Sequence, residues 1–156
     1  AGVTNSVTIA IQKGADIHAV DERFDNWTCL HFAADKGHEQ TVEMLLYYGS
    51  RVDDRDIKFN ITALHLAVLQ CRPKVCELLL AAGADPDAES IQGVSPLMIA
   101  EENEWISSKH HEVLELLSRA KRVAQRKRER EQAKDPEPLQ FRSSKKTRLV
   151  MAEDDD

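Results

Sequence analysis

The sequence predicts an all-α protein made of stacked helix-turn-helix units, with a projecting turn between one unit and the next. A six-residue block recurs with steps of 34 and 33 residues, at positions 26–31, 60–65 and 93–98. Before each block a glycine follows an apolar run of helical character, at Gly14, Gly49 and Gly83. Self-similarity at this period indicates a solenoid, because one such unit cannot bury both of its faces and must stack on its neighbours.

Each unit follows local rules of chain geometry. The block opens with a residue type that tolerates positive φ in a tight turn, and a good helix N-cap comes two residues later. A short apolar helix follows, and then a longer one that ends at a glycine in the left-handed conformation. The turn residues are Asn26, Asn60 and Gly93, and the caps are Thr28, Thr62 and Ser95.

These signals divide the chain into segments, and we expect further repeats upstream. Otherwise the apolar face of Val7, Ile9 and Ile11 would be left partly exposed. The segments are a leading partial unit, second helix and turn only (1–22), two complete repeats (23–56 and 57–90), a terminal repeat with an insertion near 101–111 (91–120), a basic helical extension (121–138), and a disordered tail that is basic and then acidic (139–156).

Composition fits one globular domain of a water-soluble protein, since the 156 residues are 42% apolar and 31% charged. We find neither a run of 18 apolar residues nor a secretory signal at the N-terminus. The three cysteines are an odd number, which disfavours a disulfide framework. The sequence therefore predicts a cytoplasmic or nuclear protein without a transmembrane segment.

Charge is segregated along the chain. Residues 1–118 carry 9 basic against 19 acidic side chains, whereas residues 119–150 carry 12 against 4. The last six residues add four negative charges. An acidic body thus precedes a basic and then acidic tail, and the body alone is expected to repel nucleic acid.

The recurring block resembles the ankyrin repeat, whose signature is Thr-Pro-Leu-His-x-Ala. The matching stretches are Thr-Cys-Leu-His-Phe-Ala at 28–33, Thr-Ala-Leu-His-Leu-Ala at 62–67 and Ser-Pro-Leu-Met-Ile-Ala at 95–100. Gly37-His38 and the Gly-Ala-Asp triplets extend the match, which covers roughly residues 1–120. The resemblance implies an ankyrin-like solenoid whose β-turn fingers and first helices form a concave surface for protein partners.

Two positions depart from the pattern. Cys71 stands where Gly37 stands one repeat earlier, so we expect a strained or differently shaped turn there. The third repeat has about five extra residues between its helices, and these include Trp105 and Ile106. We favour a covering role for this pair over the end of the stack, because a terminal repeat otherwise exposes an apolar flank. The alternative is a second contact point for a partner.

The histidines of the block do not indicate chemistry. His31 and His65 occupy one repeat position, and Met98 fills the same position in the third repeat. A metal ligand or general base could not be exchanged for methionine, so we interpret both histidines as buried residues that hydrogen-bond the turns of adjacent units. Neither the cysteines nor any glycine-rich loop form a recognisable site. We predict a non-catalytic protein with no cofactor, no metal and no small-molecule substrate.

The predicted binding residues lie on the fingers, on the first helices and in the insertion. Phe24 and Phe59 stand out as large aromatic residues on loops, although they could also fold back onto the finger backbone. The full set is Arg23, Phe24, Asp25, Trp27, Asp35, Lys36, Lys58, Phe59, Ile61, Leu69, Gln70, Ile91, Gln92, Glu102, Asn103 and Trp105.

The basic tail has three interpretations. It is a solvated helix that caps the array, a nuclear-import patch, or a segment attracted to phosphate backbones or anionic membranes. Its candidate residues are Lys121, Arg122, Arg126, Lys127, Arg128, Arg130, Lys145, Lys146 and Arg148. The main hypothesis is a scaffold or adaptor that binds proteins. The alternatives are a nuclear or nucleic-acid-associated protein that uses residues 119–148, and the targeting domain of a larger enzyme.

Overall fold

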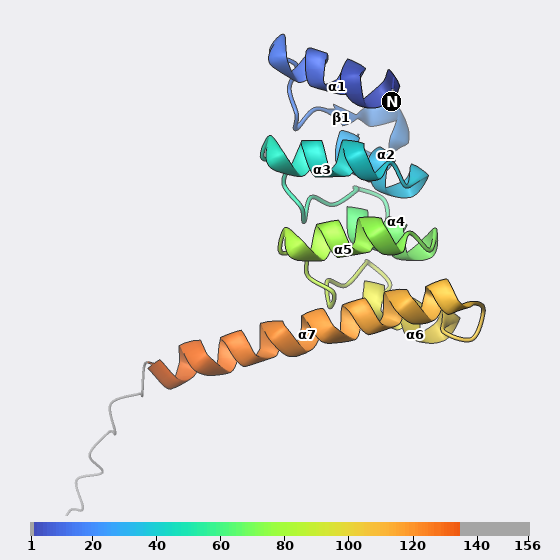
Figure 1. Ribbon diagram of the computed structural model, residues 1–156, viewed down its shortest axis with the longest axis vertical. Coiled ribbons are helices and arrows are strands. Elements are labelled where there is room, and N and C mark those ends of the chain that lie inside the picture. The colour runs from blue at the N-terminus through green and yellow to red at the C-terminus, as the bar shows by residue number, and fades with distance from the viewer. Residues whose placement is uncertain (1, 135–156) are drawn as a thin grey trace, which may run out of the picture.

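A computed structural model describes the backbone of residues 2–134 and the side chains of residues 6–133. In this part of the chain the helices stack in two layers, as Figure 1 shows. One layer contains the second helices of the repeats and the other contains the first helices. The second helices are α1 (Gly2–Gln12), α3 (Glu39–Tyr47), α5 (Pro73–Ala81) and α7 (Ser108–Lys134), and the first helices are α2 (Cys29–Lys36), α4 (Ala63–Leu69) and α6 (Pro96–Asn103).

The core runs through the stack between the two layers. Each first helix buries a leucine and an alanine at the same repeat positions, and each second helix from α3 onward buries a leucine at the equivalent place. The alanines allow neighbouring first helices to approach closely, and the leucines supply the apolar area that drives stacking. These residues are Leu30, Leu64, Leu97, Ala33, Ala67, Ala100, Leu45, Leu79 and Leu117.

The predicted turns and caps are confirmed. Asn26, Asn60 and Gly93 have φ values of 63°, 58° and 72°, and a helix begins directly after each predicted cap. The turn between α4 and α5 keeps the shape of its counterpart, since Cys71 has φ 50° where Gly37 has φ 73°. The expected strain is therefore present, because a side chain at positive φ crowds the backbone.

The block histidines are buried and hydrogen-bonded, as predicted; both hold the turn of their own repeat, and His65 also bonds the carbonyl of Val94 in the next repeat at 3.1 Å. The backbone N–H groups of Thr28 and Thr62 donate to Nδ1 of His31 and His65, each at 3.1 Å. Both rings are buried. Among the described residues, no group of three or more His, Cys, Asp or Glu side chains could hold a metal ion.

Helix α7 runs to Lys134, the last residue whose backbone is described, so the Asp-Pro pair expected to stop it lies outside the described residues. The insertion forms the loop 104–107, and the expectation that it covers the end of the stack is wrong. Trp105 is 84% exposed and Ile106 51%, whereas Val113 and Leu117 of α7 are buried. The last repeat is thus closed by its own second helix rather than by the loop.

At the start of the described chain, the apolar face of α1 is only partly covered. Val7 and Ile11 of α1 pack against the core, while Ile9 is exposed. The predicted disorder of residues 139–156 and the basic residues Lys145, Lys146 and Arg148 lie outside the described residues. No helix in the described part is long and apolar enough to cross a membrane.

Candidate functional site

The first projecting turn, called finger 1, is a small β-hairpin. Strands β1 (Val20–Asp21) and β2 (Trp27–Thr28) pair antiparallel, and the 3-10 turn η1 (Glu22–Phe24) forms the tip. The carboxylate of Asp21 accepts the backbone N–H of Arg23 at 3.0 Å and two guanidinium bonds at 3.0 and 2.8 Å. These side-chain bonds from Arg23 hold the pKa of Asp21 below its usual value. The charged pair therefore shapes the tip of the finger.

Aromatic side chains fasten finger 1 onto helix α2. The rings of Phe24 and Trp27 both meet Phe32 edge-on, with centroids 5.3 and 5.1 Å apart. Trp27 also stacks on His31 at 6.1 Å and is only partly exposed. Phe24 keeps 52% of its surface exposed. Both aromatic residues were predicted to bind a partner. Trp27 instead fixes the loop, whereas Phe24 folds back onto α2 and keeps part of its ring exposed to solvent.

The next two projecting turns, called finger 2 (57–61) and finger 3 (91–94), precede α4 and α6. Finger 2 is organised around the buried carboxylate of Asp56. Its Oδ1 accepts the backbone N–H of Ile61 at 2.9 Å and that of Phe59 at 3.2 Å. Its own N–H donates to the carbonyl of Ile61 at 3.0 Å. Because Asp56 draws the backbone inward, the tip side chains Ile57 and Phe59 point out and remain 69% and 42% exposed.

Sequence reasoning missed Asp56, although a signal was present. An acceptor side chain recurs one repeat later as Ser90, whose Oγ accepts the N–H groups of Gln92 and Val94 at 3.3 and 3.2 Å. Asp56 precedes Thr62 by six residues and Ser90 precedes Ser95 by five. The small change in spacing hides the correspondence in the sequence.

Hydrogen bonds join the three fingers into one ladder. The N–H of Ile57 donates to the carbonyl of Asp25 at 2.9 Å, and the N–H of Ile91 donates to that of Phe59 at 2.8 Å. The guanidinium of Arg55, which sequence reasoning also missed, donates across fingers 2 and 3 to the carbonyl of Glu89 at 2.6 Å. The tips are therefore fixed relative to one another before any partner arrives.

Charged and polar side chains also link neighbouring repeats, both on the fingers and at the ends of the first helices. The Nζ atom of Lys58 lies 3.9 Å from the Asp25 carboxylate and 5.0 Å from the centre of the Phe59 ring. The side-chain nitrogen of Gln70 donates to Asp35 at 3.0 Å, and Lys36 pairs with the same carboxylate at 2.9 Å. These predicted binding residues are thus brought together as links between neighbouring repeats.

The fingers carry a row of exposed apolar side chains. The finger row consists of Phe24, Ile57, Phe59 and Ile91, and Ile91 is 70% exposed. Leu69 on α4 and Met98 on α6 are also exposed on the first helices. Apolar side chains gathered on one face of a soluble fold indicate a contact surface, because water disfavours them unless a partner covers them.

The remaining predicted residues lie on fingers 2 and 3 and at the far end of α6. Gln92 lies exposed on finger 3 and Ile61 is half-buried, while Glu102, Asn103 and Trp105 lie at the far end of the helix. The indole N–H of Trp105 donates to the carbonyl of Glu102 at 2.9 Å.

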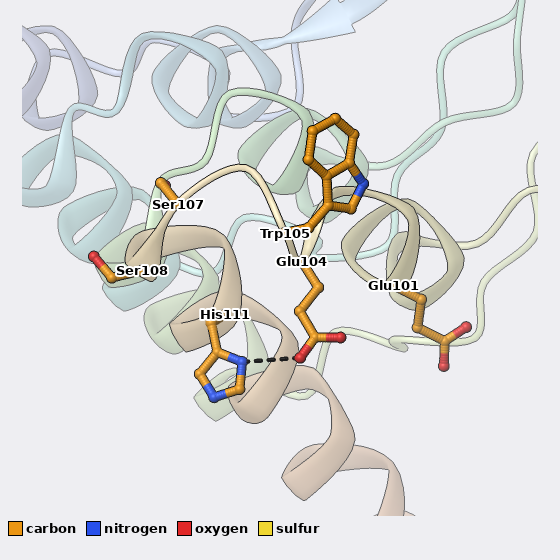
Figure 2. Close-up of a pocket in the computed structure, with 6 residues that line it drawn as sticks. All are labelled: Glu101, Glu104, Trp105, Ser107, Ser108 and His111. Atoms are coloured by element: carbon orange, nitrogen blue, oxygen red, sulfur yellow. Dashed lines mark hydrogen bonds and ion pairs between the residues drawn. The ribbon is translucent and has the colours of Figure 1, made fainter.

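The indole of Trp105 points away from the Glu104–His111 pair (Figure 2), although all three residues line one cavity. In Figure 2 the indole and the side chain of Glu104 point to opposite sides, and Glu104 bonds His111 at 3.0 Å. The shallow cavity there, about 460 Å³, is lined mainly by polar and charged side chains. Trp105 lies in the loop after α6, whereas the finger row lies on the turns before α2, α4 and α6, so Trp105 is separate from that row.

Comparison with known proteins agrees with this architecture. The family profile described as ankyrin repeats, in three copies, matches residues 1–90. The chain belongs to the ankyrin-repeat family. Ankyrin repeats are in general protein-interaction modules and typically non-catalytic, so protein partners are expected of this one.

Three relatives show the range of proteins that share the repeat. The chain is 37% identical over 99 residues to the ankyrin repeat and KH domain-containing protein mask-1 of Caenorhabditis elegans, covering 64% of this chain and 4% of the relative. It is 33% identical over 97 residues to the target of rapamycin complex 2 subunit AVO2 of Saccharomyces cerevisiae, covering 62% and 23%. It is 34% identical over 89 residues to the human ankyrin repeat and SOCS box protein 3, covering 56% and 17%. The chain thus spans about a quarter or less of each of these relatives.

Proposed function

We propose that this chain recognises a protein partner through the finger row and the exposed first-helix residues beside it. The observation that carries the proposal is the ladder Asp25–Ile57 and Phe59–Ile91, which aligns four exposed apolar side chains on consecutive fingers. Large apolar and aromatic side chains at the centre of an interface usually contribute most of its binding energy.

Preorganisation supports this proposal. Backbone bonds, the Arg55 bridge and the Lys58–Asp25 ion pair already fix the fingers, so binding costs little ordering of loops. The partner that fits has an apolar segment for the finger row and polar groups for the charged residues around it. Scaffolding or adaptor activity is the role that such a rigid, non-catalytic surface would serve.

We also propose that the chain acts as the interaction part of a longer protein, because it spans only a small share of its relatives. Any catalytic activity would then belong to other domains, for which this array selects the target. All three cysteines are unpaired, which supports a reducing compartment such as the cytoplasm or nucleus.

The test compares two double variants of the full chain in quantitative affinity capture from cell extract. Ile57→Ser with Ile91→Ser removes the two most exposed side chains of the finger row. Tyr47→Ser with Ile9→Ser removes exposed apolar side chains from the second-helix layer and serves as the control.

We expect the finger variant to lose a set of proteins that the wild type and the control retain. Direct titration of a protein from that set should then show at least a tenfold loss of affinity for the finger variant. Identical capture by both variants would show that the finger row is not the binding surface.

A further inference from the structure

The last turns of α7 extend past the stack. Val113 and Leu117 in its first half are buried against the repeats, but every residue from 125 to 133 is exposed. Figure 1 shows this end of the helix projecting past α5, with no other helix of the described chain beside it. Packing within the repeats therefore does not account for the side chains of this segment.

Four arginines form one line on the outer face of α7, here called the arginine row: Arg119, Arg122, Arg126 and Arg130. At about 100° of rotation per residue, each lies roughly 140–220° around the helix from the buried Leu117. The row therefore lies on the side of α7 opposite Leu117, and only its first member, Arg119, also borders a pocket shared with α5. At about 1.5 Å of rise per residue it extends for roughly 16 Å, with guanidinium groups about 5–6 Å apart along the axis.

These arginines are uncompensated. No ion pair or side-chain bond joins Arg119, Arg126 or Arg130 to another residue in the described part, and Arg122 bonds only the carbonyl of Ser118 in its own helix at 3.2 Å. Elsewhere cations are matched, as with Lys121 and Asp87 at 2.9 Å. Glu129 lies at the edge of the row, about 20° around the helix from Arg122, and its carboxylate accepts from Gln125 at 3.1 Å.

The chemistry of the row selects among polyanions. Arginine binds phosphate with paired N–H donors, and it outnumbers lysine in this segment. Helix α7 contains no aromatic residue on which single-stranded bases could stack, and no large apolar residue after Val123 that could insert into a bilayer. A single straight helix does fit the major groove of duplex DNA or lie along its backbone.

We propose that the arginine row binds the phosphate backbone of duplex DNA without reading base sequence. The repeats carry excess negative charge, so DNA could approach only a segment that projects away from them, as this one does. This function is independent of the finger row, because the arginine row lies on α7, in the layer of second helices, and not on the fingers.

The test measures fluorescence anisotropy of a labelled DNA duplex with the full chain over a series of salt concentrations. Four phosphate contacts predict that log K falls against log[salt] with a slope of about −3.6. Arg126→Gln with Arg130→Gln should reduce the magnitude of that slope by about 2.

The matched control, Lys121→Gln with Arg128→Gln, removes the same charge from the inner face of α7 and should leave the slope unchanged. A third variant, with Lys145, Lys146 and Arg148 all changed to Gln, should still bind. Circular dichroism confirms that the variants keep their helix.

Four results would overturn the proposal: no binding at low salt, equal losses in the row and control variants, loss of binding in the third variant alone, or tighter binding of an RNA duplex or polyglutamate than of DNA at the same salt.

Discussion

The Nε2–H of His65 donates to the carbonyl oxygen of Val94, 3.1 Å away in the finger of the next repeat. On the other side of the same ring, Nδ1 accepts the N–H of Thr62 at 3.1 Å. One buried side chain thus satisfies backbone groups in two repeats. Because interfaces between neighbouring repeats supply much of the stability of a solenoid, this ring is a structural link between α4 and finger 3.

Replacing His65 with alanine should therefore destabilise the protein by about 3 kcal/mol, since two buried backbone groups lose their partner and a cavity remains. Urea unfolding followed by circular dichroism measures the change. The exposed His38, whose ring caps nothing, provides the control, and His38→Ala should cost less than about 0.5 kcal/mol. Equal effects of the two substitutions would refute the linking role.

The same burial predicts how stability depends on pH. Burial lowers the pKa of both His31 and His65. The unfolded chain therefore takes up protons near pH 6.5 that the folded chain refuses, so stability should fall as the pH drops below about 6.5. Melting temperatures between pH 8 and pH 5 test this.

The expected curve is flat above pH 7 and declines below pH 6.5 before most carboxylates titrate. His65→Gln should decline less steeply, because one of the two buried rings is gone. A melting temperature that is constant or rises between pH 7 and pH 5 would contradict the assignment.

Truncation of the two tryptophans should reduce the free energy of unfolding by very different amounts. Trp105 is 84% exposed, so Trp105→Ala should change the free energy of unfolding by less than about 0.5 kcal/mol. Trp27 packs on Phe32 and His31, and Trp27→Ala should cost about 2 kcal/mol or more. Chemical unfolding of both variants decides the matter, and a larger cost at Trp105 would restore the covering role that the structure excludes.

The sequence predicted what local rules determine. The period, the turn residues Asn26 and Asn60 and the caps all depend on φ preference or capping, and all are confirmed. The strain expected at Cys71, where the repeat pattern calls for glycine, is also present: this residue has a positive φ of 50°.

Properties that depend on contacts across repeats were less accessible. The carboxylate of Asp56 looks like an ordinary loop residue until the backbone N–H groups of Phe59 and Ile61 are seen around it. Likewise, Trp105 could cover the stack or avoid it, and only the path of the loop 104–107 decides. The choice of binding residues remains a prediction that partner binding must test.

The three cysteines should react with iodoacetamide in a fixed order. Cys29 is exposed at the start of α2, Cys71 is half-buried, and Cys76 is buried in α5, where burial raises its pKa to about 12. Only a thiolate that the reagent can reach is alkylated, so Cys29 should be modified first and Cys76 only after unfolding in urea. Mass spectrometry of peptides over time follows each site. Modification of Cys76 in native buffer as fast as Cys29 would mean that α5 separates from its neighbours, and the described packing of the second repeat would then be wrong.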